Sequence, residues 1–369
     1  MKLAPTVIAT ASCILLSGCQ HPRTGIFPWS TPRQTQASRE LALRFLQAIA
    51  SNDCATVRSV MSPTAHLTLP VAGVYSADLH AFPAGTQWDR DTMLRNETRF
   101  RENLTGPFTQ QILSLIAEQD RAAAEVVTYG VRGATRRAFM QHGSYRFLIK
   151  DGQISDIRLY EDTFQSWDVW DNPGIPATHP FRIPAHAHSM VFEHREGTPF
   201  PADAPTQTLL RNKDVVRRFL QGVPTLARVP TANFDAVRET WAADGLWCMV
   251  IGGDRTGAQR ASGESPCFDR ESMLRMQQTG QRNLKEPLTL DINVDSMIAE
   301  GDQVSVEAVA FDIRDNDRAY RQHYSIHCTL RDGRLIEGHV YQDTLHLYDV
   351  KRQQPNAAPV SSVLDASNG

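Results

Sequence analysis

The chain contains one pattern twice, and this internal duplication limits the folds open to it more than any other feature. Leu159-Tyr160-Glu161-Asp162-Thr163 recurs as Val340-Tyr341-Gln342-Asp343-Thr344, a shift of 181 residues from Asp162 to Asp343. Repeats that build solenoids have periods of roughly 20–50 residues, so a period this long corresponds to a whole domain. Four further segments recur in the same order at similar shifts, beginning at Arg44, Trp88, Ile116 and Asp151 and again at Arg218, Phe268, Ile298 and Asp332. The sequence therefore predicts two tandem domains of one fold.

Length and charge are consistent with this arrangement. The 369 residues suffice for two ordinary domains with tails. The net charge of −3, with both signs mixed along the chain, argues against a nucleic-acid-binding protein. After the N-terminal segment there is no apolar run long enough to span a bilayer. We therefore expect any membrane association to come from the N-terminus.

The N-terminus has the pattern of a signal peptide. Met1-Lys2 precedes a mostly apolar stretch, and small residues follow it. Leu16-Ser17-Gly18-Cys19 resembles the lipobox of bacterial lipoproteins, which implies cleavage before Cys19 and lipidation of its thiol. Gln20 at the next position implies, by the same resemblance, sorting to the outer membrane. The alternative is an ordinary secretion signal with an incidental cysteine. We predict a signal peptide over 1–18, a flexible tether over 19–37, and a lipid anchor on the periplasmic face of the outer membrane.

The first copy, predicted to span 38–170, places helices before strands. Apolar residues at helical spacing predict helices near 41–49, 57–61 and 91–104, and alternation predicts strands at 66–69, 111–116, 122–131, 142–150 and 154–163. Asp151-Gly152 is typical of a hairpin turn. Helices followed by a run of strands predict an α+β fold with helices on one face of a curved antiparallel sheet.

This order of elements resembles a SnoaL-like domain of the nuclear transport factor 2-like superfamily. The resemblance is carried by Arg44-Phe45-Leu46, by the Asp-Gly turn and by the ending Tyr160-Glu161-Asp162-Thr163. It implies a cone-shaped domain with a mostly apolar pocket, in which enzymes use a carboxylate or histidine as acid or base, often with a tyrosine. Single domains of this kind often dimerise through the sheet. We therefore expect the two copies to form an intrachain pseudo-dimer.

A Pro-rich linker is predicted over 171–208, the second domain over 209–351 and a disordered tail over 352–369. The linker contains four histidines, which could bind metal or have no specific role. Cys248 and Cys267 flank a Gly-rich segment, so they could close a loop as a disulfide or remain isolated thiols. No zinc-ligand spacing or cofactor motif is found, and we predict neither a metal nor a cofactor.

Two Asp–Tyr pairs are the first candidates for catalysis. Asp162 shares strand parity with Tyr160, and Asp343 shares it with Tyr341, so each pair faces one side of its sheet. The functional interpretation is a general base beside a hydrogen-bond donor. The structural interpretation is an aspartate that holds a strand end or the domain interface.

A second group of residues is predicted to bind a ligand. His323 and His327 share one strand face in the second copy, where the first copy has His142 and Arg146. A polar row of this kind lines either a cavity or an interface. Half-buried carboxylates could act as pocket acids or paired edge residues, and aromatic residues could floor a pocket or pack in a core. These further candidates are Glu125, Glu307, Trp88, Phe268 and Trp247.

Two functions follow from these observations. The first is a cell-envelope lipoprotein that binds a small apolar ligand or a partner protein without catalysis. The alternative is a SnoaL-like isomerase, cyclase or dehydratase that uses Asp162 or Asp343 with a tyrosine or histidine. A dry pocket with one of these carboxylates at its floor would favour the enzyme. Carboxylates at the interface of the two sheets would favour binding or assembly.

Overall fold

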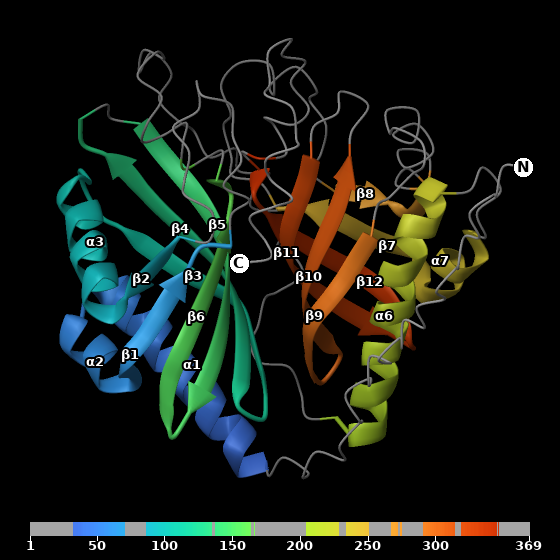
Figure 1. The fold of residues 1–369 in the computed structure, drawn as a ribbon, viewed down its shortest axis with the longest axis horizontal. Coiled ribbons are helices and arrows are strands. Elements are labelled where there is room, and N and C mark those ends of the chain that lie inside the picture. Colours follow the sequence, from blue (N-terminus) through green and yellow to red (C-terminus); the bar gives the residue numbers. More distant parts are fainter. Residues whose placement is uncertain are drawn as a thin grey trace, which may run out of the picture.

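The structure is a computed structural model in which two α+β units follow one another along the chain (Figure 1). It describes residues 32–70, 86–134, 137–163, 166, 204–228, 234–250, 267–271, 274, 291–313, 319–344 and 346. The predicted signal peptide with Cys19, the linker histidines and the predicted tail lie outside the described residues. Within the described part of the chain, no helix is both long and apolar enough to cross a membrane.

The described residues of the first unit form three named helices and a six-stranded sheet. The strands are ordered β2-β1-β6-β5-β4-β3. The elements are α1 (Pro32–Ser51), α2 (Cys54–Val60), β1 (Met61–Thr68), β2 (Gln87–Asp89), α3 (Arg90–Glu102), β3 (Thr109–Glu118), β4 (Arg121–Arg132), β5 (Arg137–Lys150) and β6 (Gln153–Glu161).

The second unit repeats this topology, with strand order β8-β7-β12-β11-β10-β9. Both units are α+β, as predicted. Each sheet is mixed rather than wholly antiparallel, because β1 pairs in parallel with β6 and β7 with β12. The elements are α6 (Thr206–Arg228), α7 (Phe234–Thr240), β7 (Trp241–Met249), β8 (Cys267–Asp269), β9 (Asp291–Glu300), β10 (Gln303–Ile313), β11 (Ala319–Arg331) and β12 (Arg334–Gln342).

Local sequence explains where several elements begin and end. α1 starts at Pro32, inside the predicted tether, and proline is well suited to the first turn of a helix because it lacks only an N–H that would have no helical partner. Asp89 caps α3 by accepting a hydrogen bond from the Thr92 N–H at 2.7 Å. Asp151 and Gly152 have φ of 52° and 74°, the left-handed conformation that a tight hairpin between β5 and β6 requires.

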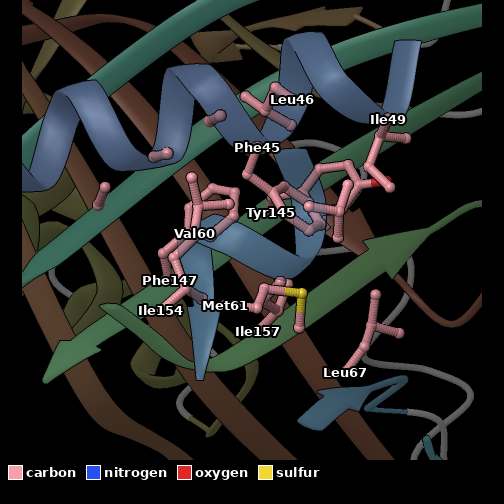
Figure 2. Close-up of a cluster of buried hydrophobic side chains, with 14 of the residues drawn as sticks. Phe45, Leu46, Ile49, Val60, Met61, Leu67, Tyr145, Phe147, Ile154 and Ile157 are labelled. Carbon is pink, nitrogen blue, oxygen red and sulfur yellow. The ribbon is translucent and has the colours of Figure 1, made fainter. Parts of the chain in front are cut away.

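The core of the first unit lies between α1 and one face of the sheet (Figure 2). Phe45 is fully buried there, with ring centroids 6.2 Å from Tyr145 and 5.6 Å from Phe147. Leu46 and Ile49 continue the buried stripe at three- and four-residue spacing. The helical spacing seen in the sequence is thus the spacing that packs α1 on the sheet.

The sheet faces opposite the helices contact each other. α2 and α3 lie at one edge of the molecule and α6 and α7 at the other, with the two sheets between them (Figure 1). Ile116 and Ala123 pack against Ile298 of the second unit. Further hydrogen bonds are reciprocal: Ala117 N–H donates to Glu300 Oε2 at 2.8 Å, and Ala299 N–H donates to Glu118 Oε2 at 2.9 Å. Equivalent residues of the two copies therefore exchange the same contacts.

Cys248 and Cys267 form a disulfide between β7 and β8, with their Cα atoms 3.9 Å apart. This confirms the loop-closing alternative. Cys328 is a buried free thiol, and burial raises its pKa.

Candidate functional site

The first unit contains a cavity of about 300 Å³ between α1, α3 and the helix-bearing face of the sheet. This volume is near the lower end of the range for small-molecule sites, roughly 300–1,000 Å³. Among the described residues, six aromatic side chains line it: Phe45, Trp88, Phe100, Phe108, Phe139 and Tyr145. Aliphatic side chains and a few polar groups complete the wall, as expected of a pocket that binds a largely apolar molecule.

The end of α1 is held at the cavity by side chains from neighbouring elements. The Gln110 amide on β3 donates to the Leu46 carbonyl at 3.1 Å. The Arg101 guanidinium on α3 donates to the Ala50 carbonyl at 3.2 Å. The Ala50 carbonyl belongs to the last turn of α1, where helical partners run out. The two hydrogen bonds also fix the position of the helix relative to β3 and α3, and hence the width of the cavity.

Glu161, the last residue of β6, lines the cavity. Burial raises the pKa of its carboxyl to about 7, although hydrogen bonds from Ser166 and Gln141 lower it and the nearby Asp162 adds a further upward shift. The Ser166 hydroxyl donates to Glu161 Oε1 at 3.3 Å. A carboxyl with a pKa near 7 can donate or accept a proton under neutral conditions.

A second carboxylate, Glu97 on α3, also lines the cavity. Burial raises its pKa, and Arg101 opposes that shift from the next helical turn, with Nε 2.9 Å from Glu97 Oε1. The Arg101 guanidinium also lies 4.1 Å from the centre of the Phe108 ring. Between these acids, the Tyr145 hydroxyl has its pKa raised by burial and by the negative charges of Glu97 and Glu161.

The predicted catalytic aspartates lie at the contact between the two units instead of in this cavity. The Thr344 hydroxyl donates to Asp162 Oδ1, and the Thr163 hydroxyl donates to Asp343 Oδ1 at 2.5 Å. Both aspartates are buried. Each copy thus uses the threonine after its aspartate to bind the aspartate of the other copy, which is the geometry of the structural alternative.

The predicted catalytic tyrosines also face the other unit. The Tyr160 hydroxyl donates to Glu307 at 3.0 Å, and the Tyr341 hydroxyl donates to Glu125 at 3.0 Å. The predicted shared face of each Asp–Tyr pair is therefore the interface between the sheets. Glu125 is fully buried and also accepts from the Ser114 hydroxyl at 2.6 Å.

The histidines predicted to bind a ligand lie on this same interface side. His142 pairs with Val127 across β4 and β5, and His323 pairs with Val309 across β10 and β11. His327 Nε2 lies 2.7 Å from the Ser144 hydroxyl of the first unit. The polar row seen in the sequence therefore lines an interface, one of the two alternatives left open. Burial and the charges of Arg321 and Arg158 lower the pKa of His323.

The predicted aromatic ligand residues separate between the two units. Trp88 lines the cavity of the first unit. Trp247 is buried in the second unit, with its ring centroid 5.0 Å from that of Phe219, and Phe268 packs against the same core. Gly338 makes room for Trp247, because a Cβ at that glycine would lie 2.3 Å from the indole ring.

The second copy differs from the first at the positions that build the cavity. Strand register equates Leu67 with Trp247, since Leu67 pairs with Ile157 and Trp247 pairs with Gly338. The larger indole thus occupies the place of a cavity-lining leucine. The repeated motif equates Glu161 with Gln342, so this carboxyl is absent from the second copy. Any chemistry that depends on Glu161 is confined to the first unit.

Sequence reasoning missed Glu97 and Glu161. For Glu161 the signal was available, because strand residues alternate between faces. If Tyr160 and Asp162 share one face, Glu161 must occupy the other, and its replacement by Gln342 marks a difference between the copies. No comparable signal marks Glu97, which lies on a helix whose charged residues are mostly exposed.

Comparisons with known proteins identify similar folded domains. No protein-family model matches the sequence, and no curated protein matches it. Among solved structures, IdmH of Streptomyces antibioticus, a candidate polyketide cyclase, matches with 21% identity, 37% coverage of this chain, 99% of that chain and a TM-score of 0.30. A candidate SnoaL-like polyketide cyclase from Jannaschia sp. CCS1 matches with 11% identity, 40% and 99% coverage and a TM-score of 0.32. An NTF2-like protein from Burkholderia xenovorans LB400 matches with 16% identity, 37% and 96% coverage and a TM-score of 0.29.

Proposed function

We propose that the protein is a cell-envelope lipoprotein whose first unit binds a small, largely apolar ligand, and whose second unit supports the first as an intrachain pseudo-dimeric partner. The observation that carries this proposal is the aromatic-lined cavity of about 300 Å³ in the first unit. The second unit has a tryptophan at the position equivalent to the cavity-lining Leu67. Its sheet packs on the first through matched polar contacts, such as the hydrogen bond between the Ser144 and Ser325 hydroxyls at 2.8 Å.

Binding is favoured over the predicted catalysis because the predicted catalytic groups are engaged elsewhere. Asp162 and Asp343 accept hydrogen bonds from threonines of the opposite unit, and both tyrosines donate to buried carboxylates. Removing any of these groups would disturb the contact between the units. Loss of a function in such a variant would therefore not identify a catalytic residue.

Native mass spectrometry of the protein purified from its own envelope tests the binding proposal. We expect a bound small molecule on the wild type, and its loss from Leu67→Trp, which introduces the side chain that the second copy has at this position. Leu210→Trp is the matched control, because Leu210 is an exposed residue of α6 in the second unit. A folded Leu67→Trp protein that retains the molecule would refute a ligand site in this cavity.

The lipid anchor is a separate part of the proposal, supported by the sequence from Leu16 to Cys19. Growth with a labelled fatty acid should label the wild type. Cys19→Ser should be unlabelled and should leave the membrane fraction. Ligand binding by the released protein should be unchanged, because the proposed site is the cavity between α1, α3 and the sheet.

A second candidate function is proton transfer at Glu161. It is favoured by the pKa of about 7 that burial confers on this carboxyl in an apolar cavity. In this case Glu161→Gln would abolish turnover of the cavity ligand while leaving its affinity within a few-fold of wild type. Unchanged turnover in Glu161→Gln would exclude this role.

A further inference from the structure

We propose that the ligand of the first-unit cavity is an amine: a molecule with one cationic nitrogen, which pairs with Glu161, and an aromatic or aliphatic body, which the aromatic wall encloses. This inference rests on the proposed binding function and adds the chemical class of the ligand. It follows from the charges that line the cavity, from the way each of them is already partnered, and from the composition of the wall.

The side chains that can carry a charge at neutral pH in the described cavity wall are carboxyl groups. Glu97 and Glu161 line the cavity, and no lysine, arginine or histidine is among the described residues that do. Arg101 lies nearby, but its guanidinium is committed to Glu97 at 2.9 Å and to the Ala50 carbonyl at 3.2 Å. The positive charge of Arg101 and the negative charge of Glu97 therefore cancel each other. In the described part of the cavity wall, the charge that remains for a ligand to meet is that of Glu161.

Among the described residues, the surroundings of Glu161 supply hydrogen bonds but no cation. Its pKa is shifted by burial, by Ser166 and Gln141, and by the negative Asp162. An ionised carboxylate in an apolar site without a cationic partner is strongly unfavourable. Near neutral pH, Glu161 is therefore protonated in a fraction of the ligand-free protein molecules. An ammonium group beside Glu161 would stabilise the ionised form. A ligand carboxylate would instead add a second negative charge to the same cavity.

The aromatic wall favours the same class of ligand. Phe100 lies with its ring centroid 5.7 Å from that of Phe108 and 5.9 Å from that of Phe139, and all three rings line the cavity. Aromatic faces attract cations within about 6 Å of the ring centroid. Arg101 already makes this contact with Phe108 at 4.1 Å. The wall therefore accepts both the apolar body of an amine and its charged head.

The duplicated chain offers an internal comparison. The second copy has Gln342 where the first has Glu161, and it has Trp247 where the first has Leu67. The copy without the carboxyl is thus also the copy in which a bulkier residue occupies the cavity wall. Loss of the charged group together with loss of space is expected if the charge served the ligand.

Three probes with the same phenyl body and different charge test the inference on the full chain. They are 2-phenylethylamine, 2-phenylethanol and 3-phenylpropanoate, and their dissociation constants are measured by isothermal titration calorimetry at pH 8. We expect the amine to bind at least about tenfold more tightly than the alcohol, a difference that corresponds to one well-placed charge interaction. The carboxylate should bind more weakly than the alcohol.

Glu161→Gln provides the decisive variant. It should reduce the preference for amine over alcohol to about onefold while leaving alcohol binding unchanged, which shows that the cavity is intact. Glu102→Gln is the control, because it removes an exposed carboxylate from the end of α3 without touching the cavity. Amine affinity should also rise from pH 6 to pH 8 in the wild type, as Glu161 loses its proton, and should not change in Glu161→Gln.

Each outcome decides the question. If the alcohol binds as tightly as the amine, the amine inference is overturned while the binding site stands. If Glu161→Gln retains the amine preference, the assigned counter-ion is wrong and the inference is likewise overturned. If none of the probes binds the wild type, the amine inference is overturned, and native mass spectrometry of the protein from its own envelope decides the binding function separately.

Discussion

The contact between the two units should weaken as the pH rises, because one of its buried carboxylates, Glu125, is held by histidine. Glu125 lies 2.6 Å from His339 Nδ1, and His339 Nε2 lies 2.9 Å from Glu337. Both Glu125 and His339 are fully inaccessible to solvent. A ring that meets carboxylates at both nitrogens needs two N–H donors, which only the protonated imidazolium has.

The size of the effect follows from the pKa of His339. Burial alone would lower that pKa, but Glu125 and Glu337 raise it to about 9, against 6.5 in the unfolded chain. A group with a raised folded pKa stabilises the fold fully below its unfolded pKa, and this contribution is lost as the pH rises through its folded pKa. A difference of about 2.5 units corresponds to about 3 kcal/mol, lost between pH 6.5 and pH 9.

The matching site in the other half supplies the control. There Glu307 accepts a hydrogen bond from Arg158 at 3.4 Å and lies 3.9 Å from Arg146, where the second copy has His339 and His327. Guanidinium groups do not titrate in this pH range. His339→Arg therefore gives Glu125 a partner that stays charged, and it should remove the alkaline loss of stability.

Urea unfolding of the wild type and His339→Arg, at intervals from pH 6 to pH 10, measures this difference. Glu161 also titrates near pH 7, so the wild-type-minus-variant free energy of unfolding isolates the contribution of His339. We expect that difference to change by about 3 kcal/mol across the range. A pH-independent difference would show that His339 is not the titrating partner of Glu125, and the assignment of a buried ion pair would be wrong.

Three further predictions concern stability. Thr163→Val and Thr344→Val should each lower the free energy of unfolding by about 1–3 kcal/mol, because each removes a hydrogen-bond donor from a buried aspartate. Unequal losses for the two variants in urea titrations would argue against equivalent roles of the two threonines. Reduction of the Cys248–Cys267 disulfide should lower the free energy of unfolding by up to about 3 kcal/mol. Reductant should therefore lower the melting temperature of the wild type and leave that of a double Cys→Ser variant unchanged. Phe45→Ala should lower the free energy of unfolding by about 3–5 kcal/mol in urea titrations. A loss below about 1 kcal/mol would contradict the full burial of Phe45.

Local spacing explains which predictions about elements are confirmed. Hydrophobic positions along α1, the turn at Asp151-Gly152 and the alternation along β5 depend on neighbours within a few residues, so one sequence suffices to see them. The parallel pairing of β1 with β6 was missed, because these strands are separated by most of the unit and no local pattern records which edge β1 joins. A wholly antiparallel sheet was predicted for that reason.

The residues at the cavity also divide into features that local sequence reveals and features that depend on distant contacts. Alternation along β6 correctly placed Tyr160 and Asp162 on one face, but it does not say whether that face meets the helices or another sheet. The face toward the helices belongs to Glu161, which lines the cavity. Of the two adjacent carboxylates in the motif, Glu161 is therefore the one that lines the cavity.

Three features can be read from the amino-acid sequence alone: a module is present twice, each copy has helices before strands, and the first copy has a glutamate where the second has Gln342. The packing of the folded units shows in addition that the polar faces of the two sheets meet, where Glu125 and Glu307 receive partners from the opposite copy. The difference arises because periodicity is a property of consecutive residues, whereas the environment of a side chain depends on which distant surface packs against it.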